Sequence, residues 1–99
     1  MPYSNIFLMA ESATGRVSIH VVFFAGARER CGVNSASVSL STRTDMGSIL
    51  TDLYKIYPDL AELHNGLIVA HNHEYCTPGQ PFTLAQGDEI AIIPPISGG

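Results

Sequence analysis

Residues 87–99 read GDEIAIIPPISGG, and they combine a turn, an apolar strand, two prolines and a terminal pair of glycines. The opening Gly-Asp pair is typical of a turn, and the β-branched residues after it predict a final strand over Glu89–Ile93. Pro94 and Pro95 fix φ and keep the preceding backbone extended, so the chain should leave this strand as a stiff stalk. The stretch therefore predicts a sheet whose last strand carries a short projecting tail.

The tail beyond the stalk consists of Ile96, Ser97, Gly98 and Gly99. Glycine has no Cβ and tolerates most backbone conformations, so the two final residues can pass through a narrow channel. The group presented there would be the terminal carboxylate of Gly99. The four tail residues reach only about 13 Å, so an active site that uses Gly99 must dock closely against the domain. The alternative is an ordinary chain end that happens to finish in glycine.

Length and composition indicate one small domain with a protein partner. A chain of 99 residues can bury roughly 60% of the surface that its unfolded form exposes, which is enough for one modest core. A hydrophobic content of 45% with 14% charged residues is high for so small a chain, so a partner is expected to cover part of its surface. Five Lys and Arg residues and a net charge of -4 offer no basic stripe for phosphates, so nucleic acid is not an expected partner.

The N-terminal part is expected to be a flexible extension over residues 1–16, ahead of the core domain over 17–95 and the reactive tail over 96–99. The apolar run at 6–10 is too short for a signal peptide, and no Lys or Arg precedes it. No stretch is long and apolar enough to predict a membrane span. We therefore expect a cytoplasmic protein without a membrane partner.

The N-terminal half of the domain predicts a hairpin followed by a helix. Residues 17–25 (VSIHVVFFA) are β-branched and aromatic, which is typical of a central strand. A polar connection over 27–34, with one helical turn as the alternative to a plain loop, leads to a half-buried strand over Ser35–Ser41. Thr44 is a favourable N-cap for the next helix, and Pro58 ends it. Apolar residues repeat along this helix at helical spacing: Met46, Ile49, Leu50 and Leu53.

The C-terminal half predicts further strands joined by turns. Asn65-Gly66 is a strong turn signal before the apolar run at 67–70. A polar strand is expected at 72–76 and a short extended segment at 82–84, before the final strand. The order is therefore ββαβ(β)β, with one main helix packed across one face of a mixed sheet. This arrangement is an α+β fold of the ubiquitin-like β-grasp type.

Alternation along the first and last strands predicts a sheet that is apolar on both faces, because successive side chains point to opposite sides. A single helix covers only one face, so the other must be covered by loops, by the N-terminal extension or by another protein. Phe24 and Ile93 fall on that second face, close to Pro94 and Pro95. We expect these four residues to form a partner interface.

The strand VVFFAGARE (residues 21–29), the central helix and the ending GDEIAIIPPISGG resemble the small, sulfur-carrier subunits of molybdopterin synthase. The resemblance covers residues 17–99, and the PPISGG ending is its most specific part. The ending looks closer to the eukaryotic members of this family. As a departure from the family pattern, bacterial members often carry aromatic residues where Ile92 and Ile93 stand.

The resemblance implies a chemical role for the tail. An activating enzyme related to ubiquitin-activating proteins would use ATP and Mg²⁺ to join Gly99 to AMP, and a persulfide sulfur would replace the AMP to leave a thiocarboxylate. The carrier would join a heterotetramer of two small and two large subunits and donate its sulfur to cyclic pyranopterin monophosphate during molybdenum cofactor biosynthesis. Side-chain catalysis would belong to the large subunit, and the carrier would hold no permanent cofactor.

Two histidines and two cysteines are the candidates for a second site. His71 and His73 alternate along the predicted polar strand and so share a face, whereas Cys76 has the opposite parity. Zinc requires three or four converging ligands, so this spacing predicts solvated or locally bonded histidines and no metal site. Cys31 and Cys76 lie far apart and are expected to stay unpaired, with a structural disulfide as the alternative.

Other functions remain compatible with a Gly-Gly ending. A sulfur carrier for thiamine thiazole synthesis or for transfer-RNA thiolation would use the same tail chemistry with another product. A ubiquitin-like modifier would instead join its C-terminus to lysines, and a passive interaction module would use the sheet face alone. The PPISGG stalk favours the molybdopterin carrier.

Overall fold

A computed structural model describes residues 15–95 of the chain. The expectations for the extension before Gly15 and for Ile96, Ser97, Gly98 and Gly99 lie outside the described residues. Within that range β1 begins at Arg16, one residue before the expected start of the domain, and the Arg16 guanidinium donates to the Ser39 carbonyl at 2.7 Å.

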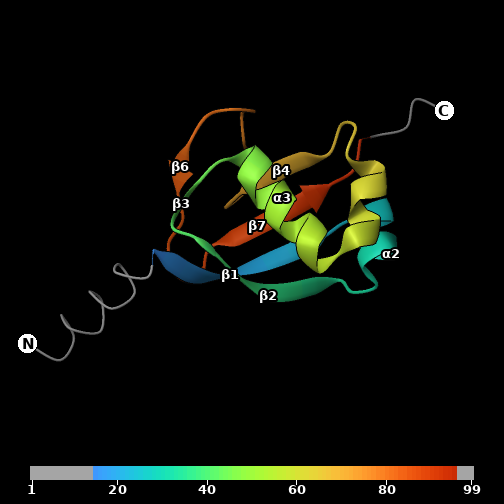
Figure 1. The fold of residues 1–99 in the computed structure, drawn as a ribbon, viewed down its shortest axis with the longest axis horizontal. Helices are drawn as coiled ribbons and strands as arrows, with labels where there is room; N and C mark the ends of the chain where they lie inside the picture. Colours follow the sequence, from blue (N-terminus) through green and yellow to red (C-terminus); the bar gives the residue numbers. More distant parts are fainter. Residues whose placement is uncertain (1–14, 96–99) are drawn as a thin grey trace, which may run out of the picture.

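The described residues form a mixed five-stranded sheet with the order β2-β1-β7-β4-β5 (Figure 1). The strand β1 (Arg16–Phe23) pairs antiparallel with β2 (Ser35–Ser41) and parallel with the central strand β7 (Glu89–Ile93). On its other side β7 pairs antiparallel with β4 (Ile68–His71), which pairs with the short edge strand β5 (Glu74–Tyr75). The bounds predicted for the last strand are confirmed to the residue.

Helices cover one face and one end of this sheet. The main helix α3 (Met46–Ile56) crosses the face, and α2 (Ala25–Cys31) lies near the 3-10 helix η1 (Pro58–Leu63) at one end (Figure 1). A second small sheet pairs β3 (Arg43–Thr44) with β6 (Phe82–Thr83). The fold is the predicted ubiquitin-like β-grasp. Among residues 15–95 no helix has the length and apolar character to cross a membrane.

The core lies between α3 and the sheet. The helix buries Ile49, Leu50 and Leu53, as its apolar spacing predicts. Opposite them β1 buries its alternate residues and β7 buries Ile90 and Ile92 completely. This alternation confirms that the two strands each send one set of side chains into the core.

The start of α3 differs from the sequence prediction. Asp45, not Thr44, is the N-cap: its side chain accepts a hydrogen bond from the Ser48 amide at 2.8 Å. Thr44 is buried in β3, because pairing with Phe82 in the small sheet holds it in the strand. The prediction missed that sheet, since its two-residue strands are too short to leave a periodic pattern.

Two further predictions require correction. The connection that contains Arg28 and Glu29 is the helix α2, which ends at the left-handed Gly32. The expected strand at 72–76 is instead a tight turn followed by β5, because Asn72 and His73 both have positive φ, at 48° and 75°. Asparagine tolerates that conformation better than most residues, which explains the turn at this point.

Candidate functional site

The sheet face opposite α3 carries a shallow apolar groove of about 230 Å³. We call it the open-face groove, and its lining residues come from the end of β1 and from β4, β5 and β7: Phe24, Ala70, His73, Tyr75, Glu89, Ala91 and Ile93. Phe24 is 45% exposed and Ile93 is half-buried, whereas their neighbours Phe23 and Ile92 are fully buried. The predicted second apolar face therefore exists and is open within the described residues.

Backbone geometry at the end of β1 turns Phe24 outward. The Phe24 amide donates to the Ile92 carbonyl at 3.1 Å, which ties this residue to β7. The next residue, Ala25, has a φ of 46°, a left-handed conformation that is rare for residues other than glycine. The Phe24 carbonyl then accepts from the Ala27 amide at 2.9 Å and starts α2. A sharp strand-to-helix turn thus presents the aromatic ring beside the last strand.

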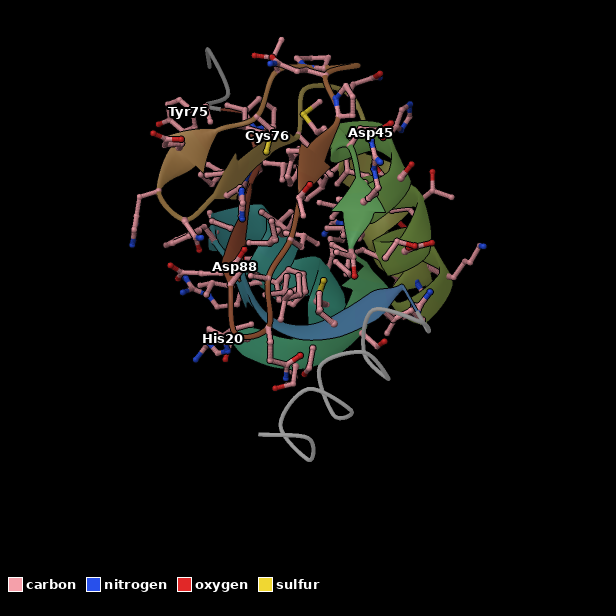
Figure 2. All side chains as sticks on the ribbon, turned by 90° about the vertical axis from the view of Figure 1, so that its left-hand side faces the viewer. His20, Asp45, Tyr75, Cys76 and Asp88 are labelled. Atoms are coloured by element: carbon pink, nitrogen blue, oxygen red, sulfur yellow. The ribbon has the colours of Figure 1, made fainter. Side chains whose placement is uncertain are left out.

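Tyr75 forms the outer wall of the groove. It is 76% exposed and lies on the side of the sheet away from α3 (Figure 2). Its partner across the β4–β5 ladder is Ala70, which also lines the groove and whose small side chain leaves space beside the Tyr75 ring. Nε2 of His73 lies 3.5 Å from a carboxylate oxygen of Glu89 at the rim. An apolar floor with a polar rim is the usual composition of a protein-binding surface.

The root of the tail borders the same groove. Ile93 pairs with Ile68, which is 38% exposed, in the last recorded pair of the β4–β7 ladder. Pro94 and Pro95 follow directly, half-buried and exposed respectively. Proline has no N–H to donate, so the ladder cannot continue through these two residues. The four interface residues predicted from the sequence therefore meet at one end of the molecule, where the chain leaves the sheet.

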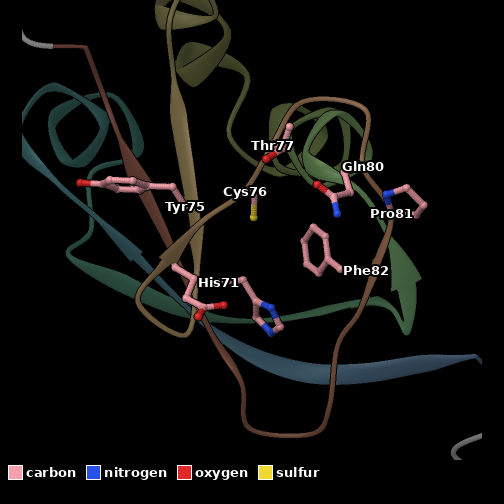
Figure 3. A pocket seen from close by; sticks show the side chains of 8 residues that line it. His71, Tyr75, Cys76, Thr77, Gln80, Pro81 and Phe82 are labelled. Carbon is pink, nitrogen blue, oxygen red and sulfur yellow. The ribbon is translucent and has the colours of Figure 1, made fainter.

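A second cavity, of about 180 Å³, lies on the other side of β4 (Figure 3). The His71 ring stacks on Phe82 with 5.0 Å between centroids, and Cys76 faces the same cavity. His73 instead lines the open-face groove. The prediction that His71 and His73 share a face, with Cys76 on the other, was wrong because the turn at Asn72 reverses the alternation.

His71 belongs to a network that fastens the β4–β5 turn to β7. Its Nε2 lies 2.7 Å from Oδ2 of Asp88, which also accepts from the Ala85 amide at 2.9 Å. Oδ1 of Asn72 accepts from the Glu89 amide at 2.8 Å. Burial alone would raise the pKa of the Asp88 carboxyl, but its hydrogen bonds with His71, with the Ala85 amide and with Asn72 outweigh burial and lower that pKa. The network stabilises a turn and offers no free catalytic group.

The cysteines do not have the character of nucleophiles. Both are free thiols in the structure, so the alternative of a disulfide between them is not realised. Burial raises the pKa of Cys31 to about 11 and also raises that of Cys76, which keeps both protonated near neutral pH. Over residues 15–95 no group of three or more His, Cys, Asp and Glu side chains is placed to hold a metal ion.

Sequence reasoning found Phe24 and Ile93 but missed Ala70 and Tyr75. Ala70 lies on β4 and Tyr75 on β5. Because a polar strand was expected at 72–76, the turn that brings β5 beside β4 was not predicted. The signal that was available is Tyr75 itself, a large aromatic residue within a polar stretch.

Comparison with known proteins identifies relatives of this chain. The ThiS family matches residues 21–99. A molybdopterin synthase sulfur carrier subunit from Aedes aegypti is 38% identical over 84% of this chain and 90% of its own length. The subunit of that name from Homo sapiens is 38% identical over 82% of this chain and 93% of its own length.

Solved structures share the fold. SAMP1 from Haloferax volcanii superposes with a TM-score of 0.68 at 28% identity, over 83% of this chain and 99% of that one. One chain of a complex of subunits 1 and 2 of the molybdopterin-converting factor from Helicobacter pylori gives a TM-score of 0.59 at 20% identity, over 84% and 100%. The chain belongs to the ThiS family and is a homologue of the molybdopterin synthase sulfur carrier subunits.

Proposed function

We propose that this protein carries sulfur on its C-terminus and delivers it to the large subunit of a molybdopterin synthase. In this role Gly99 is the reacting residue, Ile96, Ser97 and Gly98 are the tail that carries it, and the open-face groove is the docking surface. The curated relatives named as sulfur carrier subunits of molybdopterin synthase support this role.

The single observation that carries the proposal is the position of the groove beside the root of the tail. Phe24, Ile93 and the two prolines lie at the same end of the molecule. A partner that covers the groove therefore has the tail at its edge. Because the tail reaches only about 13 Å, close docking is required for Gly99 to arrive in a pocket of that partner.

The chemistry begins with activation, because a free carboxylate is a poor electrophile. An adenylating enzyme joins the Gly99 carboxylate to AMP from ATP, with Mg²⁺, and releases pyrophosphate. The terminal sulfur of a persulfide then displaces AMP, and a thiol cleaves the resulting acyl disulfide to release a thiocarboxylate and a disulfide. The thiocarboxylate is ionised at neutral pH and has a soft sulfur nucleophile, which suits it to attack the substrate.

Delivery takes place in the large subunit. The loaded tail donates sulfur to cyclic pyranopterin monophosphate, and hydrolysis returns Gly99 as a carboxylate. Two such transfers supply both sulfurs of the dithiolene, which fits a heterotetramer of two small and two large subunits. The neighbour solved as a complex of subunits 1 and 2 of a molybdopterin-converting factor is consistent with such a partner. The carrier positions the reacting thiocarboxylate, and the large subunit supplies the catalytic side chains.

Reconstitution tests the proposal. The full chain, its activating enzyme, ATP, Mg²⁺ and a persulfide source are combined with the large subunit and the pterin precursor. We expect sulfur to appear in the product in proportion to the loaded carrier, and a variant lacking Gly99 to form none while it keeps the wild-type melting temperature. Near-normal product from that variant would show that Gly99 is not the reacting residue.

The same reconstitution separates the alternatives. Loading of Gly99 without transfer to the pterin precursor would point to a thiamine or transfer-RNA pathway. SAMP1 is named a small archaeal modifier protein, and the likeness to it makes a modifier role the competing outcome. That role predicts conjugates joined through Gly99 to lysines, seen as a ladder of heavier species in cells, and no transfer of sulfur from Gly99 to the pterin precursor.

A further inference from the structure

Gly66 lies against the stalk at the point where the tail begins. It occupies the turn before β4 with a φ of +88°. A Cβ placed on this residue would lie 3.1 Å from Cγ of Pro95, 3.2 Å from its Cβ and 3.8 Å from its Cδ. The first two distances are shorter than ordinary carbon contacts, so any side chain at position 66 requires the proline ring or the turn to move.

The register of the sheet explains why these two residues meet. β4 and β7 pair antiparallel, with Val69 opposite Ile92 and Ile68 opposite Ile93. Continuing the same register by two residues places Gly66 opposite Pro95. Residues opposite each other in such a pair direct their side chains to the same face. The contact therefore extends the ladder beyond its last pair, Ile68 and Ile93.

The prolines give this contact its importance. Neither Pro94 nor Pro95 can donate a hydrogen bond, so the backbone ladder cannot hold the chain in line after Ile93. Contact between the Pro95 ring and the bare backbone of Gly66 restrains the direction of the stalk instead. The turn is itself anchored, because Leu67 is buried and Ile68 is paired.

We infer that Gly66 is a positioning residue for sulfur transfer: its missing side chain seats Pro95 and so directs the tail toward the pocket of the large subunit. This inference rests on the proposed function. The stalk lies at the base of a tail of about 13 Å, so a change in the direction of the stalk at Pro95 displaces the path of the tail toward Gly99. Misplacement of a reacting group by about 1 Å can cost roughly 100-fold in rate.

A matched pair of variants isolates the contact. Gly66→Ala adds the methyl group that meets Pro95, and it also strains the backbone at positive φ. Gly79→Ala imposes the same kind of backbone strain, since Gly79 has a φ of +80° but no neighbouring atom within 4 Å of an added Cβ. The difference between the two variants therefore reports the contact with Pro95 and not the strain.

Single-turnover kinetics provide the measurement. Each variant is loaded as the thiocarboxylate, and its sulfur transfer is followed against increasing concentrations of the large subunit. We expect Gly66→Ala to lower the plateau rate roughly 10- to 100-fold with a much smaller change in the half-saturating concentration, because the residues that line the open-face groove are unchanged and only Pro95 at its edge moves. Gly79→Ala should stay within about twofold of the wild type on both measures.

Nuclear Overhauser contacts between Gly66 and the Pro95 ring give a structural signature of the same inference. They should be present in the wild type and in Gly79→Ala, and weakened in the position-66 variant. If Gly66→Ala does not fold, Gly66→Asn and Gly79→Asn replace the alanine pair, because asparagine tolerates positive φ and still carries a Cβ.

The outcomes separate this inference from the proposed function. A wild-type chain that transfers sulfur, with equal plateau rates for the two variants, overturns the positioning role and leaves the carrier function intact. A wild-type chain that never accepts sulfur on Gly99 overturns both. A lower plateau rate in both variants, matched to their loss of stability, would assign Gly66 a purely structural role and would also overturn the inference.

Discussion

Asp88 fastens three segments of the chain with a single side chain and its backbone. Its carboxylate meets the His71 ring and the Ala85 amide, and its carbonyl accepts from the His20 amide on β1 at 2.8 Å. These contacts hold the turn before β7 against both neighbouring strands. Because the native state favours the ionised carboxylate, protonation of Asp88 must weaken the fold.

We predict a specific acid sensitivity from this residue. A carboxyl whose native pKa is lowered stabilises the fold at pH above its unfolded value of about 3.9, and the stabilisation disappears as pH falls through the native pKa. Asp88→Asn should therefore reduce the free energy of unfolding at neutral pH and flatten its decline below about pH 4. Urea unfolding over an acid pH series measures both effects. An unchanged slope in the variant would contradict this role for Asp88.

At the scale of elements, β7 serves two surfaces at once. Ile90 and Ile92 enter the core, while Ala91 and Ile93 line the open-face groove. The strand therefore couples the stability of the domain to the surface beside the tail. The parallel pairing with β1 and the antiparallel pairing with β4 hold it rigidly in the centre of the sheet.

Adjacent alanine substitutions on β7 should have very different costs. Ile92→Ala removes a fully buried side chain and is expected to lower the free energy of unfolding by about 2 to 5 kcal/mol. Ile93→Ala acts on the half-buried groove side and should cost about 1 kcal/mol. Urea titrations of the two variants make the comparison. Equal losses would mean that the groove side of β7 is packed as tightly as the core.

The elements that sequence predicts best are those with long periodic patterns. The predicted positions of α3 and β7 agree closely with the observed ones, because the apolar residues of α3 recur at helical spacing and prolines follow both elements. Sequence reasoning failed at the turn through Asn72 and at the pairing of β3 with β6. A positive φ and a two-residue strand depend on distant neighbours, and neither leaves a local pattern.

The candidate site was predictable to a similar degree. Phe24 and Ile93 follow from the alternation of their own strands. Tyr75 does not, because its place at the groove depends on the pairing of β5 with β4. The contact between Gly66 and Pro95 was also out of reach, since it joins two turn residues through the register of a sheet.

At the scale of the whole molecule, the open-face groove lies beside the root of the tail. The exposed residues Phe24 and Ile56 provide a test, because one lies in the open-face groove and the other on α3, across the sheet. They are 45% and 51% exposed, so replacing either should leave the core intact. Only the groove residue should matter for association.

We expect Phe24→Glu to weaken binding to the large subunit by at least about 2 kcal/mol, or roughly 30-fold in Kd, because a charge would be buried in the complex. Ile93→Glu should also weaken binding to the large subunit. Ile56→Glu is the control and should bind as the wild type does. Titration calorimetry with the full chain measures all three. Unchanged affinity in Phe24→Glu would place the docking surface elsewhere.

The central claim is that sulfur travels on Gly99, and intact-mass analysis of the loaded protein tests it most directly. After incubation with the activating enzyme, ATP and a persulfide source, one terminal oxygen should be replaced by sulfur, and peptide mapping should place the change in the last peptide. A Cys31→Ala/Cys76→Ala double variant should load equally well. A mass change that maps to Cys31 or Cys76, or a double variant that cannot be loaded, would contradict the account.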